Sequence, residues 1–167
     1  ALTLTGAHDA VLSSTTFGTV RLEAKAVRPL GSRVRVIGRG EVGQIFTDDL
    51  EALPPTRRFI TGGDQSVRGW GWETLAPAVG DTALVGGKVL AVASLETDFE
   101  VIPAWRVAAF GDAGNAAEDF GSLTWEYSVG AGIRWASPLG MLRLDFAFPL
   151  TDPDRSFRLH LVIGPDL

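Results

Sequence analysis

One arginine and two acidic residues are the side chains of this sequence best placed to act on each other. Arg68 lies in a segment in which glycines at positions 62, 63 and 69 permit tight backbone turns. Glu96 and Asp112 fall at interior positions of two consecutive predicted strands, so their carboxylates should face each other across one ladder in partly dehydrated surroundings. Because a guanidinium can fork to one carboxylate while it touches a second, the pattern predicts an ion-paired group of these three residues.

The remaining candidates for catalytic chemistry are weak. Residues 63–66 lack the strand-turn-helix context of a nucleophile elbow, and residues 69–71 lack the third glycine of a dinucleotide site. His160 is expected to fill interior space rather than to act as a base. With no cysteine and two histidines, the chain has too few ligands for a zinc site. The sequence therefore predicts no enzyme, no catalytic residue, no metal and no cofactor.

Composition narrows the class of protein further. The chain has 167 residues, 46% of them apolar, and a formal net charge of −5, which excludes a disordered chain. Acidic residues outnumber basic ones by 20 to 15, so nucleic acid is a poor candidate partner. The longest strongly apolar run covers residues 89–93, well short of the roughly 18 to 20 residues of a membrane helix. Composition does not exclude a membrane barrel built from strands.

Apolar and charged residues alternate with a period of two along most of the chain. Such alternation is typical of strands that have two different faces, and no segment has a helical apolar stripe. The pattern predicts an all-β fold with an even number of antiparallel strands. The eight candidate strands cover residues 2–5, 19–27, 33–46, 88–99, 104–113, 126–136, 141–148 and 156–164.

Two orientations of these strands are possible. A soluble ligand-binding barrel of the lipocalin kind would turn its apolar face inward, whereas a transmembrane β-barrel would turn it toward lipid. The charged face carries near-balanced charges with Gly and Ala, which suits a pairing lumen. Tyr127 and Trp135 lie eight residues apart on the apolar face, a spacing typical of two interfacial girdles, and short connections alternate with long ones. These features favour the transmembrane barrel.

The longest connection, residues 47–81, carries the most specific sequence. Its centre, residues 58–77, reads RFITGGDQSVRGWGWETLAP, and loops of this length are usually functional. The tetrapeptide Val67, Arg68, Gly69 and Trp70 resembles the signature of the sixth extracellular loop in the Omp85 superfamily, and the longer form looks most like the TamA group. Residues 110–114, with Phe110, Asp112 and Gly114, match the family's F-x-D-x-G. The ending at residues 163–167 is similar to the terminal strand of TamA proteins.

The resemblance implies a location, an activity and partners. Residues 1–167 would form a single half-barrel domain in the bacterial outer membrane, the last eight of the family's sixteen strands, without the periplasmic POTRA domains. In the complete protein the family's role is the insertion or translocation of outer-membrane proteins such as autotransporters. The partners would be lipid, nascent outer-membrane proteins and a TamB-like periplasmic protein; the fragment alone should be inactive.

The resemblance also implies roles for particular residues. Arg68 would be held in the lumen by Asp112 and Glu96, with Phe110 packed beside them. The last strand would form one side of the seam through which clients leave. Its apolar side chains are Phe157, Leu159, Leu161 and Ile163.

The number of strands conflicts with the length of the loop. An eight-stranded barrel has an interior just wide enough for its own side chains. Either a second copy completes a sixteen-stranded barrel, or the chain closes on itself with residues up to about Ala10 extending the first strand. We expect the closed eight-stranded barrel, in which the loop around Arg68 is displaced. A passive membrane scaffold or small pore is a further alternative.

Overall fold

The computed structural model describes residues 1–7, 16–79, 83–138, 140–152 and 156–164. Three sequence-based expectations concern residues outside these ranges. They are the end of the long loop at Asp81, the extension of the first strand to Ala10, and the family-like ending beyond Gly164.

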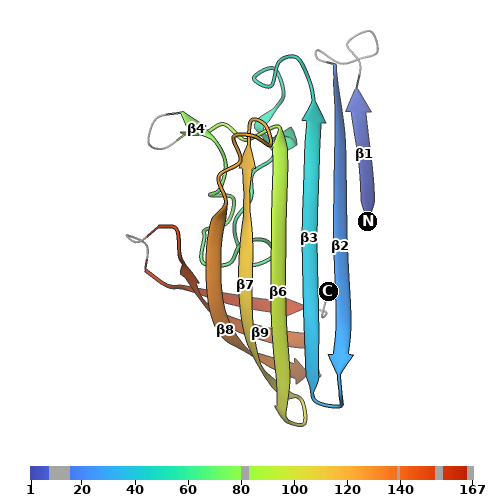
Figure 1. Ribbon diagram of the computed structural model, residues 1–167, viewed down its shortest axis with the longest axis vertical. Coiled ribbons are helices and arrows are strands. Elements are labelled where there is room, and N and C mark those ends of the chain that lie inside the picture. The colour runs from blue at the N-terminus through green and yellow to red at the C-terminus, as the bar shows by residue number, and fades with distance from the viewer. Residues whose placement is uncertain (8–15, 80–82, 139, 153–155, 165–167) are drawn as a thin grey trace.

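Eight antiparallel strands form one continuous sheet, as the alternation predicts. They follow the order β1-β2-β3-β6-β7-β8-β9-β10, so each strand pairs with its neighbours along the chain (Figure 1). A separate two-stranded sheet of β4 (Ala78–Val79) and β5 (Ala83–Leu84) lies in the β3–β6 connection. The strands of the large sheet are β1 (Leu2–Ala7), β2 (Phe17–Leu30), β3 (Val34–Phe46), β6 (Val89–Ile102), β7 (Trp105–Ala117), β8 (Glu126–Ser137), β9 (Gly140–Pro149) and β10 (Arg158–Gly164).

The sheet buries its charged face and exposes its apolar one. Along β6 the side chains alternate between buried Ser94, Glu96 and Asp98 and exposed Leu95 and Phe99. The same arrangement continues on the later strands and confirms the predicted orientation. The exposed apolar side chains there include Val107, Tyr127, Val129, Ile133, Trp135, Phe146, Phe148, Leu159, Leu161 and Ile163.

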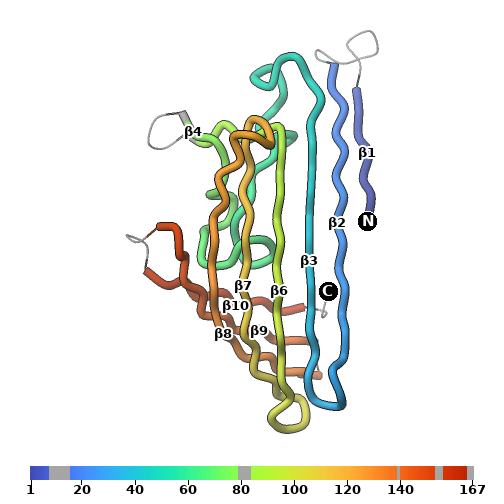
Figure 2. Tube along the Cα trace, in the orientation of Figure 1, coloured from blue at the N-terminus to red at the C-terminus, as the bar shows by residue number. Residues whose placement is uncertain are grey.

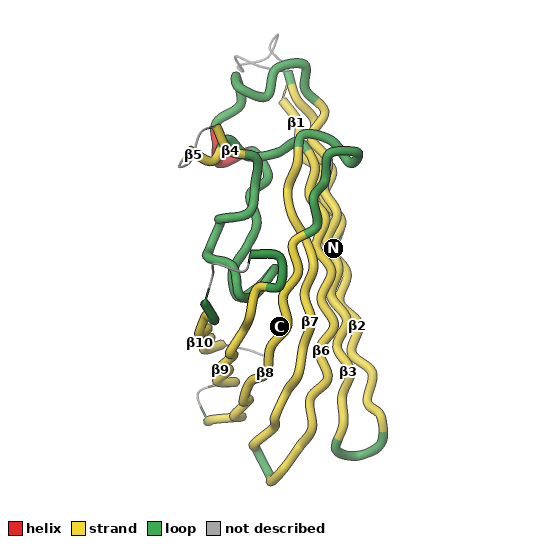
Figure 3. The backbone as a smooth tube through the Cα atoms, turned by 60° about the vertical axis from the view of Figure 1, so that its left-hand side comes forward, coloured by secondary structure: helices red, strands yellow, loops and turns green. Residues whose placement is uncertain are grey.

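The sheet is curved but does not close. β1 pairs with β2 and β10 with β9, and no ladder joins β1 to β10 among the described residues. The expected closed eight-stranded barrel is therefore wrong. The physical reason is the β3–β6 connection, which lies on the concave side of the sheet, where a closed barrel of this size would have no room for it (Figure 3).

The described parts of the β3–β6 connection, residues 47–79 and 83–88, lie against the sheet (Figure 2). Its apolar side chains form a core with the upper parts of β3, β6 and β7. Within the described ranges the helical structure is the short 3-10 helix η1 (Pro55–Arg57), and no helix is long and apolar enough to cross a membrane. The buried members of this core are Ile45, Leu50, Leu53, Phe59, Val67, Trp70, Leu75, Leu90, Val92 and Ala116.

Candidate functional site

Arg68 is completely buried at the centre of the concave face, with 0% of its surface exposed. Its Nε donates to Oδ2 of Asp112 at 2.8 Å and its Nη2 to Oδ1 at 2.9 Å, so the guanidinium forks onto this carboxylate. The backbone N–H of Arg68 donates to the same carboxylate at 3.1 Å. Asp112 thus fixes both the side chain and the main chain of the loop. The expected displacement of the loop is wrong.

The other side of the guanidinium contacts β6, β7 and β9. Nη1 donates to Oε2 of Glu96 at 2.7 Å and to Oδ2 of Asp145 at 3.3 Å, and Nη2 donates to Oγ of Ser94 at 3.3 Å. The ring of Phe110 lies 3.4 Å from the guanidinium carbon, so it covers one face of the cation. Nε, Nη1 and Nη2 of Arg68 therefore all donate hydrogen bonds to acceptors on the sheet.

A second arginine completes the group. Arg134 donates from Nη2 to Oε1 of Glu96 at 3.0 Å and from Nη1 to Oδ1 of Asp145 at 2.5 Å. We call Arg68, Arg134, Glu96, Asp112 and Asp145 the lumenal ion cluster. Burial lowers the pKa of Arg68, but hydrogen bonds and charge from Asp112, together with Glu96, outweigh burial and raise it above its usual value. The loop arginine is thus held as a permanent cation.

The register of the sheet corrects one detail of the sequence prediction. Glu96 and Asp112 do not face each other across the β6–β7 ladder, because Glu96 lies opposite Phe110 and Asp112 opposite Ser94. The two carboxylates are diagonal neighbours, which a branched guanidinium can span. Phe110 fills the position between them, and this explains why its ring lies against Arg68.

Sequence reasoning did not assign Arg134, Asp145, Ser94 or His160 to this group. All four lie on the charged parity of their strands, so the alternation did place them on the concave face. Their contacts depend on the register between strands and on the path of the loop, which alternation alone does not give. His160 accepts a hydrogen bond on Nε2 from the backbone N–H of Gly69 at 3.1 Å.

The comparisons with known proteins agree with this geometry. A family model described as the Omp85 superfamily domain matches residues 2–166. The chain belongs to the Omp85 superfamily. It is similar to "Outer membrane protein assembly factor BamA" of Nitratidesulfovibrio vulgaris, with 28% identity over 138 residues that cover 78% of this chain and 17% of that protein.

A solved structure shares the fold of this Omp85 chain. BamA from Haemophilus ducreyi lacking POTRA domains 1-3 superposes with a TM-score of 0.74 at 19% identity, over 91% of this chain and 36% of that chain. The chain spans well under half the length of either similar protein. It supplies eight strands of an Omp85-type β-barrel, a class of bacterial outer-membrane protein.

Two glycines of the Omp85 chain allow the loop and the sheet to approach closely. Gly69 has a φ of 92°, and a Cβ on it would lie 3.2 Å from the backbone nitrogen of Pro149 and 3.3 Å from Cβ of Ser128. Gly114 packs on β6, where a Cβ would lie 2.7 Å from the carbonyl oxygen of Ala91. Both positions therefore require glycine, since any side chain would push the loop or the strand away.

Within the described part of the chain, the last strand has a neighbouring strand on one side only. β10 pairs with β9 on one side, and its exposed apolar side chains Leu159, Leu161 and Ile163 point away from the concave face. Phe157 precedes the strand, and its ring lies 6.0 Å from that of Phe148. Together these residues make the outer side of β10 apolar, and one edge of the strand pairs with no other strand among the described residues.

Proposed function

We propose that this chain works as the C-terminal half of an Omp85 barrel that inserts or translocates outer-membrane proteins. The observation that carries the proposal is the edge of β10 that pairs with no described strand, beside a loop that is anchored in the lumen by Arg68. A strand edge in lipid seeks backbone partners, because unpaired amide groups are costly there. A client strand that pairs with this edge would satisfy them.

The relatives support an assembly role. The similar protein from Nitratidesulfovibrio vulgaris is described as an outer membrane protein assembly factor. We extend the proposal to one group within the superfamily, the TamA group, because residues 58–77 resemble its loop sequence. We assign it to a TamA-like protein that handles autotransporter-type clients with a TamB-like periplasmic partner.

The lumenal ion cluster has a positioning role in this proposal. Arg68 performs no catalytic step, since strand insertion neither breaks nor forms a covalent bond. Its ion pairs hold the loop against β6, β7 and β9, which keeps the concave face filled beside the seam strand. Without this anchor the loop would leave the lumen and the seam would lose its support.

The proposal is tested in an Omp85 protein with a complete barrel in which residues 1–167 form the C-terminal half, reconstituted into liposomes with an unfolded outer-membrane barrel protein as client. Arg68→Ala should lower the rate at which the client acquires its heat-resistant, faster-migrating form by about tenfold or more, as expected for the loss of a buried ion-paired group. Arg57→Ala is the matched control, because Arg57 is an exposed arginine of the same connection.

Three outcomes decide the matter. An unchanged rate for Arg68→Ala contradicts the positioning role, and catalysed insertion by residues 1–167 alone contradicts the need for a complete barrel. Faster insertion of a general barrel protein than of an autotransporter contradicts the TamA-like assignment. In the described ranges β1 and β10 each have a strand on one side only, which permits a second copy to complete the barrel. Light scattering in detergent would then give the mass of a dimer.

A further inference from the structure

Two consecutive residues of the loop contact four strands of the sheet. The side chain of Arg68 binds carboxylates on β6, β7 and β9. The backbone N–H of the next residue, Gly69, donates to Nε2 of His160 on β10 at 3.1 Å. This short piece of the loop therefore connects the centre of the sheet to its last strand.

His160 lies beside the lumenal ion cluster. It is opposite Asp145 on the β9–β10 ladder, and Asp145 accepts hydrogen bonds from both Arg68 and Arg134. Because Nε2 of His160 accepts a hydrogen bond, this nitrogen carries no proton, and the neutral ring has its proton on Nδ1. The contact thus requires one particular form of the imidazole.

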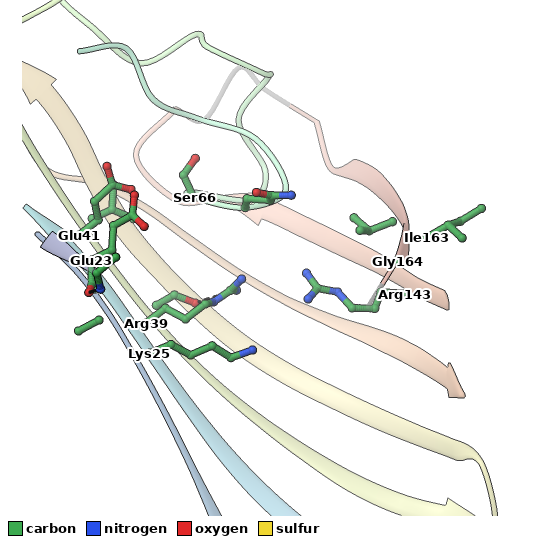
Figure 4. Close-up of a pocket in the computed structure, with 15 residues that line it drawn as sticks. Glu23, Lys25, Arg39, Glu41, Ser66, Arg143, Ile163 and Gly164 are labelled. Carbon is green, nitrogen blue, oxygen red and sulfur yellow. Dashed lines mark hydrogen bonds between the residues drawn. The ribbon is translucent and has the colours of Figure 1, made fainter. Parts of the chain in front are cut away.

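The loop and the end of β10 are apart elsewhere. A cavity of about 420 Å³ lies between them, lined by Ser66 of the loop and by Ile163 and Gly164 at the end of the strand. Figure 4 shows these residues around the space. Within the described ranges, the bond to His160 is the one hydrogen bond that joins the loop to β10.

β10 depends on few other contacts for its position. The strand has seven residues, and its one described neighbour in the sheet is β9. Elements with few contacts open and move more readily than the rest of a fold. A partner strand pairs more tightly with an edge that is already held in place, because less motion is lost on pairing.

We infer that His160 is a positioning residue that couples the seam strand β10 to the loop anchored by Arg68. Its acceptor nitrogen holds the inner side of β10, so that the strand offers its outer edge to a client in a fixed place. The inference rests on the proposed function and names a residue that serves it. Because coupling between two contacts is reciprocal, loss of the Arg68 anchor also removes the effect of His160.

The first test examines the form of the imidazole in the full chain in detergent micelles. The sequence has two histidines, so ¹⁵N-labelled histidine gives two sets of ring signals, and His8→Gln identifies those of His160. Nitrogen NMR should show a neutral His160 ring with its proton on Nδ1. A proton on Nε2 would overturn the inference, because that nitrogen could not accept from Gly69.

The second test measures amide hydrogen exchange at Gly69 in variants of His160. His160→Ala should make exchange about fivefold faster, as expected for the loss of one hydrogen bond. His160→Gln should restore slow exchange, because the side-chain carbonyl oxygen of Gln can accept the same N–H. Val162→Ala is the matched control and should leave exchange unchanged, since Val162 is the next inward-facing residue of β10 and makes no hydrogen bond to the loop among the described residues.

The third test uses the complete Omp85 barrel in liposomes and varies the concentration of the unfolded client. His160→Ala should raise the concentration that gives half the maximal insertion rate by about fivefold and leave the maximal rate unchanged. His160→Gln should restore the original value. A purely structural loss would instead lower the maximal rate, which follows the amount of folded protein. On the Arg68→Ala background, His160→Ala should have no further effect.

The outcomes separate this inference from the proposed function. Equal exchange at Gly69 in His160→Ala and the unmodified chain, or an unchanged half-maximal concentration, would overturn the coupling. If the unmodified barrel inserts no client, the proposed function is wrong, and the NMR and exchange measurements still decide whether His160 couples β10 to the loop. If His160→Ala does not fold, the imidazole form and the His160→Gln variant decide.

Discussion

At the scale of single residues, a buried arginine stabilises the loop because all its partners are in place. Removing two charges from water is costly, and their attraction compensates only when the remaining donors and acceptors are satisfied. Arg68 meets this condition through Asp112, Glu96 and the ring of Phe110. Removal of one partner would leave buried charges unpaired and would lower the stability of the folded chain.

Arg68→Ala should therefore destabilise the chain by about 3–5 kcal/mol, because three buried carboxylates would lose a shared cation. Urea unfolding in detergent micelles, followed by tryptophan fluorescence, measures the change. Arg57→Ala should stay within about 0.5 kcal/mol of the unmodified chain, as is usual for an exposed position. Equal losses for the two variants would contradict the contacts of Arg68.

The core of this site could be predicted from local sequence. Glu96 and Asp112 lie on the charged parity of β6 and β7, so the alternation places both carboxylates on the concave face. Arg68 lies in the loop, and its role as their cation came from its charge, the flanking glycines and the resemblance to the Omp85 loop signature. Arg134 and Asp145 escaped prediction because their contacts require the β8–β9 register. Gly132, opposite Asp145, leaves the space in which that carboxylate meets Arg134, and nothing in the local sequence marks it.

At the scale of elements, the loop reaches the sheet only because its backbone can pass close to β8 and β9. Gly69 makes this close approach possible, because it has no side chain and lies beside Ser128 and Pro149. Its N–H is also the donor to His160 on β10, so the same residue links the loop to the seam strand. A side chain at this position would disturb both contacts.

Gly69→Ala should destabilise the loop by about 1–2 kcal/mol, since a positive φ is unfavourable for residues that carry a Cβ. Limited proteolysis should then cut the β3–β6 connection faster than in the unmodified chain. Gly18→Ala is the control in β2, where a Cβ meets no atom within 4 Å. A stable, uncut Gly69→Ala chain would show that the loop tolerates a shift at this point.

The open form of the sheet was not predictable in the same way. Strand positions follow from alternation within a segment, but closure depends on whether β1 and β10 can meet while the loop stays inside. The packing of Val67, Trp70 and Leu75 against β3 and β6 decides this, and such packing is set by residues far apart in sequence. The cost of an unpaired strand edge in lipid favoured the prediction of closure.

At the scale of the whole molecule, the sheet has the opposite distribution of side chains from that of a soluble protein. Its ion pairs lie on the concave side, and its apolar side chains cover the convex side. An exterior of this kind is stable against lipid tails and unstable in water, where it would drive association. The Omp85 match and the fold agree with the lipid-facing arrangement.

Collision accessibility of spin labels tests this arrangement most directly, since the chain has no cysteine and single cysteines can be placed at will. Labels at Val107, Val129 and Leu161, in chains reconstituted into bilayers, should collide mainly with oxygen dissolved in lipid. A label at Gln65, an exposed residue of the β3–β6 connection on the concave side, should collide mainly with a water-soluble nickel complex. Preferential collision of the three strand labels with nickel would contradict a lipid-facing exterior and with it the membrane barrel.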